Sequence, residues 1–132
     1  MPLSHIRCYC LSKPYTTEEL PFNDMTLVYK VHGKIFAIMA LDTQDSITLK
    51  CIPLDALERR ASYDSVQPGY HMNKQHWITV PLDSSIPAQL LYTWIDDSYS
   101  LVVAGLPVAR KQEIVQALAD LAQKSANSQE KI

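Results

Sequence analysis

The segment HMNKQHW, residues 71–77, places two histidines, an asparagine, a lysine and a tryptophan within seven positions. His71 and His76 are separated by four residues, which is close to the spacing of histidine pairs in zinc sites. No cysteine pair or carboxylate cluster lies nearby in the sequence to complete a tetrahedral set, and the gap in Cys8-x-Cys10 is shorter than zinc ligands use. We therefore predict neither a metal site nor a cofactor.

Nucleophilic catalysis is also disfavoured by the sequence. A serine or cysteine nucleophile needs a base within hydrogen-bond reach. Cys51 alternates with Thr48 and Lys50, which predicts that its thiol faces a core and behaves as a small hydrophobe. Ser98 lacks the flanking glycines of a hydrolase elbow, and the three glycines of the chain are too scattered for a phosphate-binding loop. We expect no catalytic residue and no enzymatic activity.

The adjacent acids Asp96 and Asp97 could be a general acid–base pair. Neighbouring residues on a helix point about 100° apart, however, so the two carboxylates would not face each other. The sequence therefore favours a solvated helix end at this position.

Composition limits the classes of partner. The chain of 132 residues is the size of one domain, 1–132, with 47% hydrophobic and 20% charged residues. Its net charge of −2 does not match the basic footprint of an avid nucleic-acid binder, so nucleic acid would need a local patch. The sequence shows no signal-peptide core, no apolar run of ~18 residues and no disulfide framework. We expect a cytoplasmic protein with reduced thiols and no membrane partner.

The elements that position these residues begin with a hairpin. Two β-rich runs, residues 26–31 and 34–41, are separated by His32-Gly33, which favours a type I′ turn with positive φ at both residues. This turn pairs residue 31 with 34, 29 with 36 and 27 with 38. One face then carries Leu27, Tyr29, Phe36 and Ile38, and the other carries Val28, Lys30, Ala37 and Met39.

Further strands are predicted at 46–52 and 76–82, and helices at 4–12, 54–61, from about 85 or 87, and 107–124. The helix at 54–61 has apolar residues at 54, 57 and 61. The segment 15–24 is predicted to be a connector with one helical turn at 17–20, the segment 62–75 a long loop, and the polar tail 125–132 a frayed end. This order predicts an α+β domain of two layers, an antiparallel sheet with helices packed on one face.

The sequence also resembles a known family. The blocks PFNDMTLVYKVHGKIFAIMAL, ITLKCIPLDALE, PGYHMNKQHWITVPLD and DDSYSLVVAGLP, in this order, are similar to the MmcQ/YjbR family of small bacterial proteins over roughly residues 4–120. The resemblance implies a frataxin-like (CyaY-like) α+β fold. It also implies a DNA-binding role, by structural likeness to a double-wing phage transcription factor. The hairpin loop departs from the family in carrying His32 where other members often have a smaller or acidic residue.

The DNA-binding hypothesis places contacts on the open sheet face and the 71–77 loop. If the apolar residues pack under the helices, Lys30, Lys50, Trp77 and Thr79 share the uncovered face. A tryptophan among lysines can stack on bases while the ammonium groups meet phosphates. The loop and the hairpin tip would extend this patch with Lys34, His71, Asn73, Lys74 and His76. Such binding to DNA should be weak and salt-sensitive.

Two alternatives compete with this hypothesis. In the first, Tyr70, His71, Asn73 and Trp77 line a pocket for a small ligand or a segment of a partner protein. In the second, the same residues only stabilise the fold: the stems of the lysines lie across Trp77, while His71 and Asn73 bond the backbone of their loop.

Overall fold

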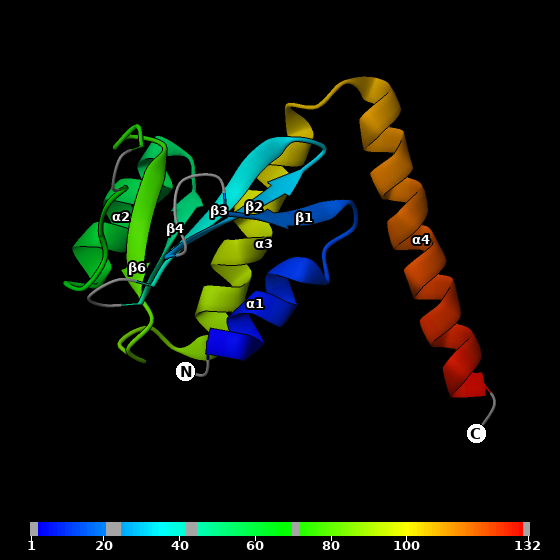
Figure 1. The fold of residues 1–132 in the computed structure, drawn as a ribbon, viewed down its shortest axis with the longest axis horizontal. Helices are drawn as coiled ribbons and strands as arrows, with labels where there is room; N and C mark the ends of the chain where they lie inside the picture. Colours follow the sequence, from blue (N-terminus) through cyan, green and yellow to red (C-terminus); the bar gives the residue numbers. More distant parts are fainter. Residues whose placement is uncertain (1–2, 21–24, 42–44, 70–71, 131–132) are drawn as a thin grey trace.

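The computed structural model describes residues 3–20, 25–41, 45–69 and 72–130, the last five of these by their backbone alone. The described chain forms the predicted α+β fold, with one antiparallel sheet in the strand order β1-β2-β3-β4-β6-β5 (Figure 1). The strands are β1 (Thr16–Glu19), β2 (Thr26–Val31), β3 (Lys34–Ala40), β4 (Ser46–Lys50), β5 (Gln67–Pro68) and β6 (Trp77–Pro81). The helices are α1 (Leu3–Leu11), α2 (Pro53–Ser62), α3 (Ala88–Ala104) and α4 (Val108–Glu130).

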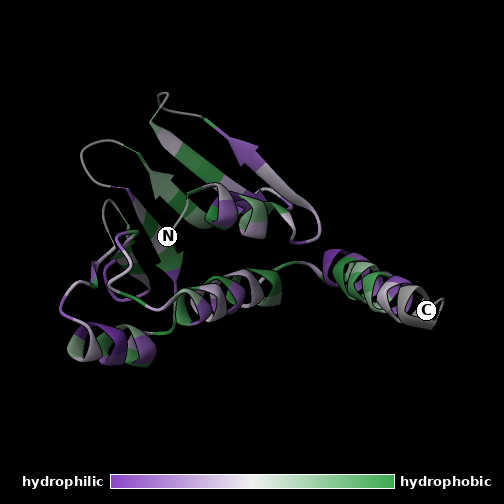
Figure 2. Cartoon of the chain, turned by 90° about the horizontal axis from the view of Figure 1, so that it is seen from below, coloured by the Kyte–Doolittle hydropathy of each residue, from purple (hydrophilic) through white to green (hydrophobic). Residues whose placement is uncertain are grey.

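The core lies between one face of the sheet and the helices α1 and α3, which Figure 2 shows on the same side of the sheet. Alternate residues of each strand point into it because successive side chains of a strand face opposite ways. The sheet contributes Tyr29, Ala37, Met39, Ile47, Leu49, Ile78 and Val80. The helices contribute Ile6, Cys10, Leu91, Trp94, Ile95, Tyr99 and Val102.

The hairpin between β2 and β3 has the predicted turn but not the predicted register. His32 and Gly33 both have positive φ, +46° and +81°, and residue 31 pairs with 34. An irregularity then adds one residue to β3, so that Tyr29 lies opposite Ala37 and Leu27 opposite Met39. The predicted faces agree with the structure for β2 but were wrong for Ala37, Ile38 and Met39 of β3, because one extra residue reverses the parity of the strand beyond it.

Beyond Ala37 and Leu49, strands β3 and β4 part. The next pair in this register is Phe36 and Lys50, whose backbone groups are bridged by the hydroxyl of Ser98 on α3. Ser98 accepts a hydrogen bond from Lys50 N at 2.8 Å and donates one to Phe36 O at 2.6 Å. The hydroxyl thus stands between two groups that a continued ladder would join directly. As a result, the end of α3 lies where the two strands diverge.

Two short strands were absent from the sequence prediction. A helical turn was predicted at residues 17–20, but residues 16–19 form β1, which pairs with β2. Glu18 on β1 accepts hydrogen bonds from Arg7 and from the hydroxyl of Tyr29. These contacts stabilise the extended backbone of β1 relative to a helical turn. Residues 67–68 form β5, which pairs with β6.

Helix α2 forms as predicted but presents a different face to the core. Leu54 and Leu57 are exposed, and Ala56 is the buried residue of the helix. Arg59, three residues after Ala56, lies on the same side and reaches α3. The ion pair of Arg59 with Asp97 and its contact with the Trp94 ring therefore orient α2. They do so although Leu54 and Leu57 are left exposed.

Helix α4 begins close to the predicted position and continues to Glu130, six residues beyond the predicted end at 124. Ile114 and the preceding Leu106 are buried against the body of the protein, while the rest of the helix leads away from it (Figure 1). None of the helices in the described chain is long and apolar enough to cross a membrane.

Candidate functional site

A cavity of about 420 Å³ brings together three residues that the sequence analysis singled out, Lys34, Lys50 and Trp77. It lies at the hairpin end of the sheet, beside the opening between β3 and β4. Its walls come from the hairpin tip, from β4 and β6, and from the end of α3. The lining residues are Gly33, Lys34, Ile35, Lys50, Trp77, Leu101, Val102 and Gly105. We call this the Trp77 cavity.

The register of the sheet explains why Lys50 and Trp77 meet. These two residues are direct partners at the end of the β4–β6 ladder. They follow the core pair Leu49 and Ile78, so their side chains point to the opposite face of the sheet. Directly opposite residues on antiparallel strands have Cβ atoms roughly 5 Å apart, which places the ammonium stem of Lys50 beside the indole.

The walls of the Trp77 cavity are apolar and its charged groups are both cations. Lys34 is exposed and Lys50 is half-buried, and neither forms an ion pair with a described residue. No carboxylate is among the lining residues. This chemistry fits an anionic group at the two ammonium groups and an apolar group against Trp77.

Trp77 itself is only 8% exposed. Gly69, which directly follows β5, lies against this residue, and Gly69 N donates to Trp77 O at 2.8 Å. A Cβ atom at Gly69 would lie 2.4 Å from the Cβ of Trp77, so only glycine permits this approach. The indole is therefore a wall of the cavity, and only a small part of its surface is open to a ligand.

Two other predicted contact residues lie on the same face of the sheet but have partners of their own. Lys30 forms an ion pair with Glu19 at 2.7 Å. The hydroxyl of Thr79 shares a 2.8 Å hydrogen bond with that of Thr48, which lies opposite it. Neither residue lines the Trp77 cavity.

The loop that precedes β6 is held by its own backbone. The side-chain oxygen of Asn73 accepts a hydrogen bond from Gln75 N at 2.9 Å, and the backbone carbonyl of Asn73 accepts one from His76 N. Lys74 and His76 are exposed, while Tyr70 and His71 lie outside the described residues. For Asn73, these bonds match the alternative in which this residue stabilises its loop.

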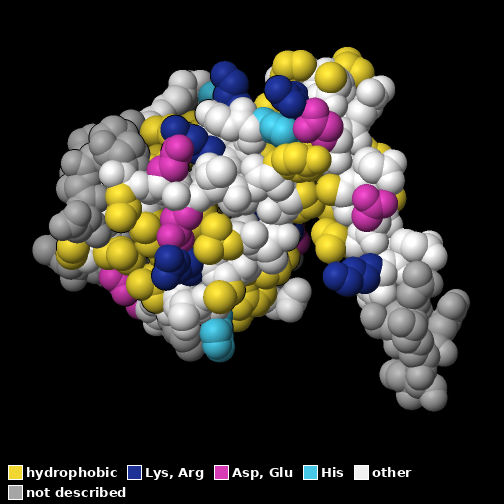
Figure 3. All heavy atoms as spheres, turned by 45° about the vertical axis from the view of Figure 1, so that its right-hand side comes forward, with side chains coloured by type: hydrophobic (Ala, Val, Ile, Leu, Met, Phe, Trp, Pro, Cys, Tyr) yellow, Lys and Arg dark blue, Asp and Glu magenta, His cyan; other side chains and the backbone are white. Residues whose placement is uncertain are grey.

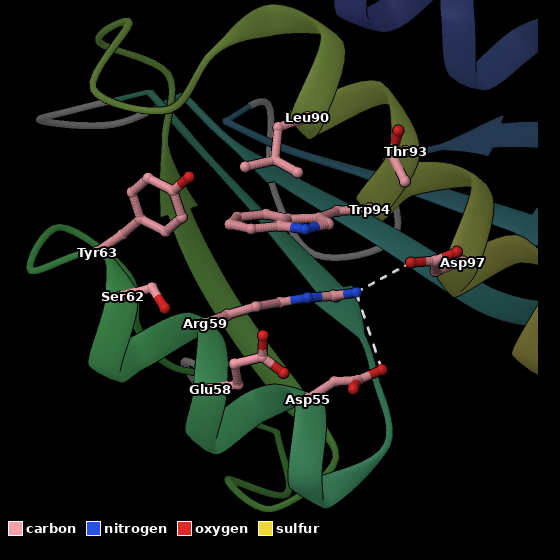
Figure 4. A pocket seen from close by; sticks show the side chains of 9 residues that line it. All are labelled: Asp55, Glu58, Arg59, Ser62, Tyr63, Leu90, Thr93, Trp94 and Asp97. Carbon is pink, nitrogen blue, oxygen red and sulfur yellow. Dashed lines mark hydrogen bonds and ion pairs between the residues drawn. The ribbon is translucent and has the colours of Figure 1, made fainter.

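A second cavity, of about 390 Å³, lies between α2 and α3 and was missed by the sequence analysis (Figure 4). Arg59 crosses it with its guanidinium beneath the Trp94 ring, 4.9 Å from the ring centroid. The same guanidinium forms ion pairs with Asp97 at 2.9 Å and Asp55 at 4.0 Å. The Arg59 side chain is 11% exposed, so the cavity already contains a cation bound to its aromatic wall and two of its acids. We interpret this arrangement as the clamp that joins α2 to α3.

The predicted solvated helix end at Asp96 and Asp97 was wrong. Both residues lie within α3, and each is bound by a different element. Asp96 accepts from the hydroxyl of Tyr9 and pairs with Lys13, whereas Asp97 pairs with Arg59. The carboxylates do point apart, as predicted, because neighbouring helical positions diverge. They attach α1 and α2 to different sides of α3.

The cysteines and other candidate ligands show no shared site. Cys10 and Cys51 are buried, Cys8 is exposed, and all three are free thiols. Burial raises the pKa of Cys10 to about 12 and also raises the pKa of Cys51, the residue predicted to face the core. Within the described ranges, no group of three or more His, Cys, Asp or Glu could hold a metal ion.

The contribution of α3 to the Trp77 cavity was missed as well. The sequence analysis gave Leu101, Val102 and Gly105 no role in a site, because such residues carry no sign of a binding role in a sequence. Their place in the cavity depends on the divergence of β3 and β4, which in turn depends on Ser98.

Comparison of the sequence with known proteins identifies relatives of this chain. The YjbR family model matches residues 11–101. The "Uncharacterized protein YjbR" of Escherichia coli K12 is 32% identical over 117 residues, which cover 88% of this chain and 99% of that protein. The "Uncharacterized protein YbdF" of Escherichia coli O157:H7 is 41% identical over 97 residues, 73% of this chain and 80% of that protein.

Solved structures give the same result for the fold. The crystal structure of Deinococcus radiodurans protein DR2400, with domain DUF419, aligns with a TM-score of 0.78 at 37% identity, covering 85% of this chain and 86% of that one. A crystal structure of a Pseudomonas syringae protein aligns with a TM-score of 0.68 at 27% identity, covering 76% of this chain and 98% of that one.

Proposed function

The chain belongs to the YjbR family, and within that family we propose that it is a non-enzymatic binding protein whose Trp77 cavity takes a small organic anion. The observation that supports this proposal is the convergence of Lys34, Lys50 and Trp77 on one cavity of about 420 Å³. That volume is within the range of roughly 300–1,000 Å³ that is usual for small-ligand sites.

The chemistry of the walls defines the ligand class. Two ammonium groups without a carboxylate nearby attract a phosphate or carboxylate group. Ile35, Leu101 and Trp77 supply an apolar surface for a planar or aliphatic group attached to it. A ligand with both parts would use the whole cavity, whereas a bare inorganic anion would use only its rim.

The proposal is tested by thermal unfolding in the presence of matched ligands. Phenyl phosphate, adenosine 5′-monophosphate and octanoate should raise the melting temperature, because a ligand that binds the folded state stabilises it by mass action. Phenol, adenosine and octanol, which lack the charge, should not. The variant Lys34→Ala/Lys50→Ala should lose the shift, and Lys74→Ala, an exposed lysine outside the cavity, should keep it. Equal shifts in the double variant would refute the proposal.

DNA binding stays a second candidate, supported by the common face of Lys30 and Lys50 and by the exposed Lys34 at the hairpin tip. Because Lys30 is paired with Glu19, we count phosphate contacts from Lys34 and Lys50 alone. Two such contacts give a slope of about −1.8 for log K against log salt concentration. Oligonucleotides in the same thermal assay separate the candidates: a shift with DNA and none with the small anions would favour the DNA-binding role.

A further inference from the structure

Helix α4 leaves most of its apolar side chains without a partner in the described chain. Its first turns are anchored by the buried Ile114 and by Glu113, whose carboxylate lies 3.4 Å from His32 Nε2. Beyond this anchor, Val115 is 65%, Leu118 49% and Leu121 52% exposed. Figure 1 shows α4 leading away from the sheet and from α3 after its first turns, and Figure 3 shows hydrophobic side chains on its surface. An isolated helix gains little stability in water, since helices in proteins depend on packing an apolar face.

Part of the apolar surface of α4 follows the spacing of a helix that pairs with another helix, with Leu121 and the buried Ile114 beside it. Val108, Val115 and Ala122 recur every seven residues, and Leu118 and Lys111 occupy the intermediate positions of the same stripe. The other charged residues with described side chains, Arg110, Glu113, Asp120 and Lys124, fall on the remaining sides of the helix. This is the division of apolar seam and charged outer surface that a two-helix interface requires.

We propose that this stripe is the interface of a symmetric dimer, in which α4 packs against α4 of a second copy of the chain in the antiparallel orientation. A two-fold axis between residues 116 and 117 sets Val115 of one copy against Leu118 of the other. It also sets Lys111 against the small, exposed Ala122. The stripe is thus complementary to itself, as an isologous interface must be.

The single charge on the stripe selects the orientation of the two helices. Lys111 is the one charged residue with a described side chain on the stripe. In a parallel pair it would face the Lys111 of the other copy, and two like charges would oppose each other. In the antiparallel pair its stem lies over Ala122 of the other copy, and its ammonium group reaches solvent. The antiparallel arrangement also sets the positive N-terminal end of each helix dipole beside the negative C-terminal end of the other.

The size of the stripe predicts a weak dimer. Residues 108–124 span roughly 25 Å, and a helix with its side chains is about 10–12 Å across. Two such strips cover on the order of 500 Å², below the roughly 1,000 Å² that is typical of stable specific interfaces. We expect a dissociation constant on the order of 100 µM, with hydrogen exchange in residues 115–125 slowing as the protein concentration rises.

Sedimentation velocity of the full chain from about 10 µM to about 1 mM tests the proposal, because this range spans the expected dissociation constant. The weight-average mass should rise from monomer towards dimer. Leu118→Lys should increase the dissociation constant at least about tenfold, as expected for a residue at the centre of an interface. The control Gln116→Lys, which adds the same charge on the outer side, should change it less than about twofold.

A disulfide test checks the orientation. In a Cys8→Ser background, which removes the exposed thiol, a mixture of Val115→Cys and Leu118→Cys chains should cross-link to each other on oxidation. Each variant alone should cross-link poorly, because position 115 of one copy does not face position 115 of the other, and the same holds for position 118. Monomeric behaviour over the whole concentration range, or preferential cross-linking of Val115→Cys with itself, would overturn the proposal. An unchanged dissociation constant for Leu118→Lys would do the same.

Discussion

The backbone amide of Lys50 on β4 donates a hydrogen bond to the hydroxyl of Ser98 on α3, with 2.8 Å between the nitrogen and the oxygen. Ser98 in turn donates a hydrogen bond to Phe36 O of β3, so one buried hydroxyl replaces a direct hydrogen bond between the two strands. This bridge joins the core to the candidate site. It holds β3 and β4 apart where Lys50 turns towards Trp77 and where α3 contributes Leu101 and Val102 to the same cavity.

Replacing Ser98 by alanine should destabilise the protein by about 2–3 kcal/mol. The substitution removes the partner of a backbone N–H and of a backbone carbonyl in a buried position, and unsatisfied buried groups carry a full desolvation cost. Urea unfolding measures the change. The control Ser100→Ala, at an exposed position on the same helix, should alter the free energy of unfolding by less than about 0.5 kcal/mol. Equal effects of the two substitutions would contradict the role of the bridge.

Replacing Arg59 by alanine should loosen α2 from α3. The variant loses the ion pair with Asp97 and the contact with the Trp94 ring, which together should lower the free energy of unfolding by about 1–2 kcal/mol. Trp94 fluorescence should shift to longer wavelength as water reaches the ring. The neighbouring variant Arg60→Ala removes the same charge without these contacts. If it shifted the fluorescence equally, the clamp would not be the cause.

The three thiols should react at very different rates. Cys8 is exposed, while Cys10 and Cys51 are buried and their pKa values are raised by burial, that of Cys10 to about 12. Because the thiolate is the reactive form, Ellman's reagent at pH 8 should modify one thiol quickly in the folded protein and all three in denaturant. Cys8→Ser should remove the fast phase. Rapid reaction of the two remaining thiols in that variant would contradict the burial of Cys10 and Cys51.

Acid should destabilise the protein through Glu18. Hydrogen bonds from Arg7, and then from Tyr29, lower the pKa of this carboxyl below its ordinary value of 4.5. A lowered pKa in the folded state stabilises the protein above pH 4.5, and this contribution is lost as the pH falls through the folded value. Glu18→Gln should therefore cost about 1 kcal/mol at pH 7 and flatten the fall in stability below pH 4.5. The same fall in stability below pH 4.5 in Glu18→Gln as in the unaltered chain would contradict this role of Glu18.

The sequence predicted the larger elements of the fold because their signals are local. The β2–β3 turn follows from His32-Gly33, and the helices follow from apolar spacing and proline positions. Strand β1 was missed because its extended form depends on partners distant in sequence, Arg7 and Tyr29 among them. The extra residue in β3 was missed because nothing in its sequence marks the irregularity, although this one residue decides which side chains face the core.

The candidate site was predictable only in part. Alternation within β4 and β6 correctly placed Lys50 and Trp77 on one face, since that pattern is a property of each strand. The ion pair of Lys30, the burial of Trp77 and the contribution of α3 depend on tertiary packing. The Arg59 clamp escaped notice for the same reason, because its partners Trp94 and Asp97 lie more than thirty residues away along the chain.

The most direct test of the binding proposal uses the fluorescence of Trp77. The chain has two tryptophans, so Trp94→Phe leaves Trp77 as the single reporter inside the cavity. Titration with phenyl phosphate should give a saturable change in emission that weakens as salt is added, since the ammonium groups supply the attraction. The change should vanish in the Lys34→Ala/Lys50→Ala background and should not occur with phenol. The same saturable change with phenol, or with both lysines removed, would contradict the proposal that this cavity binds organic anions.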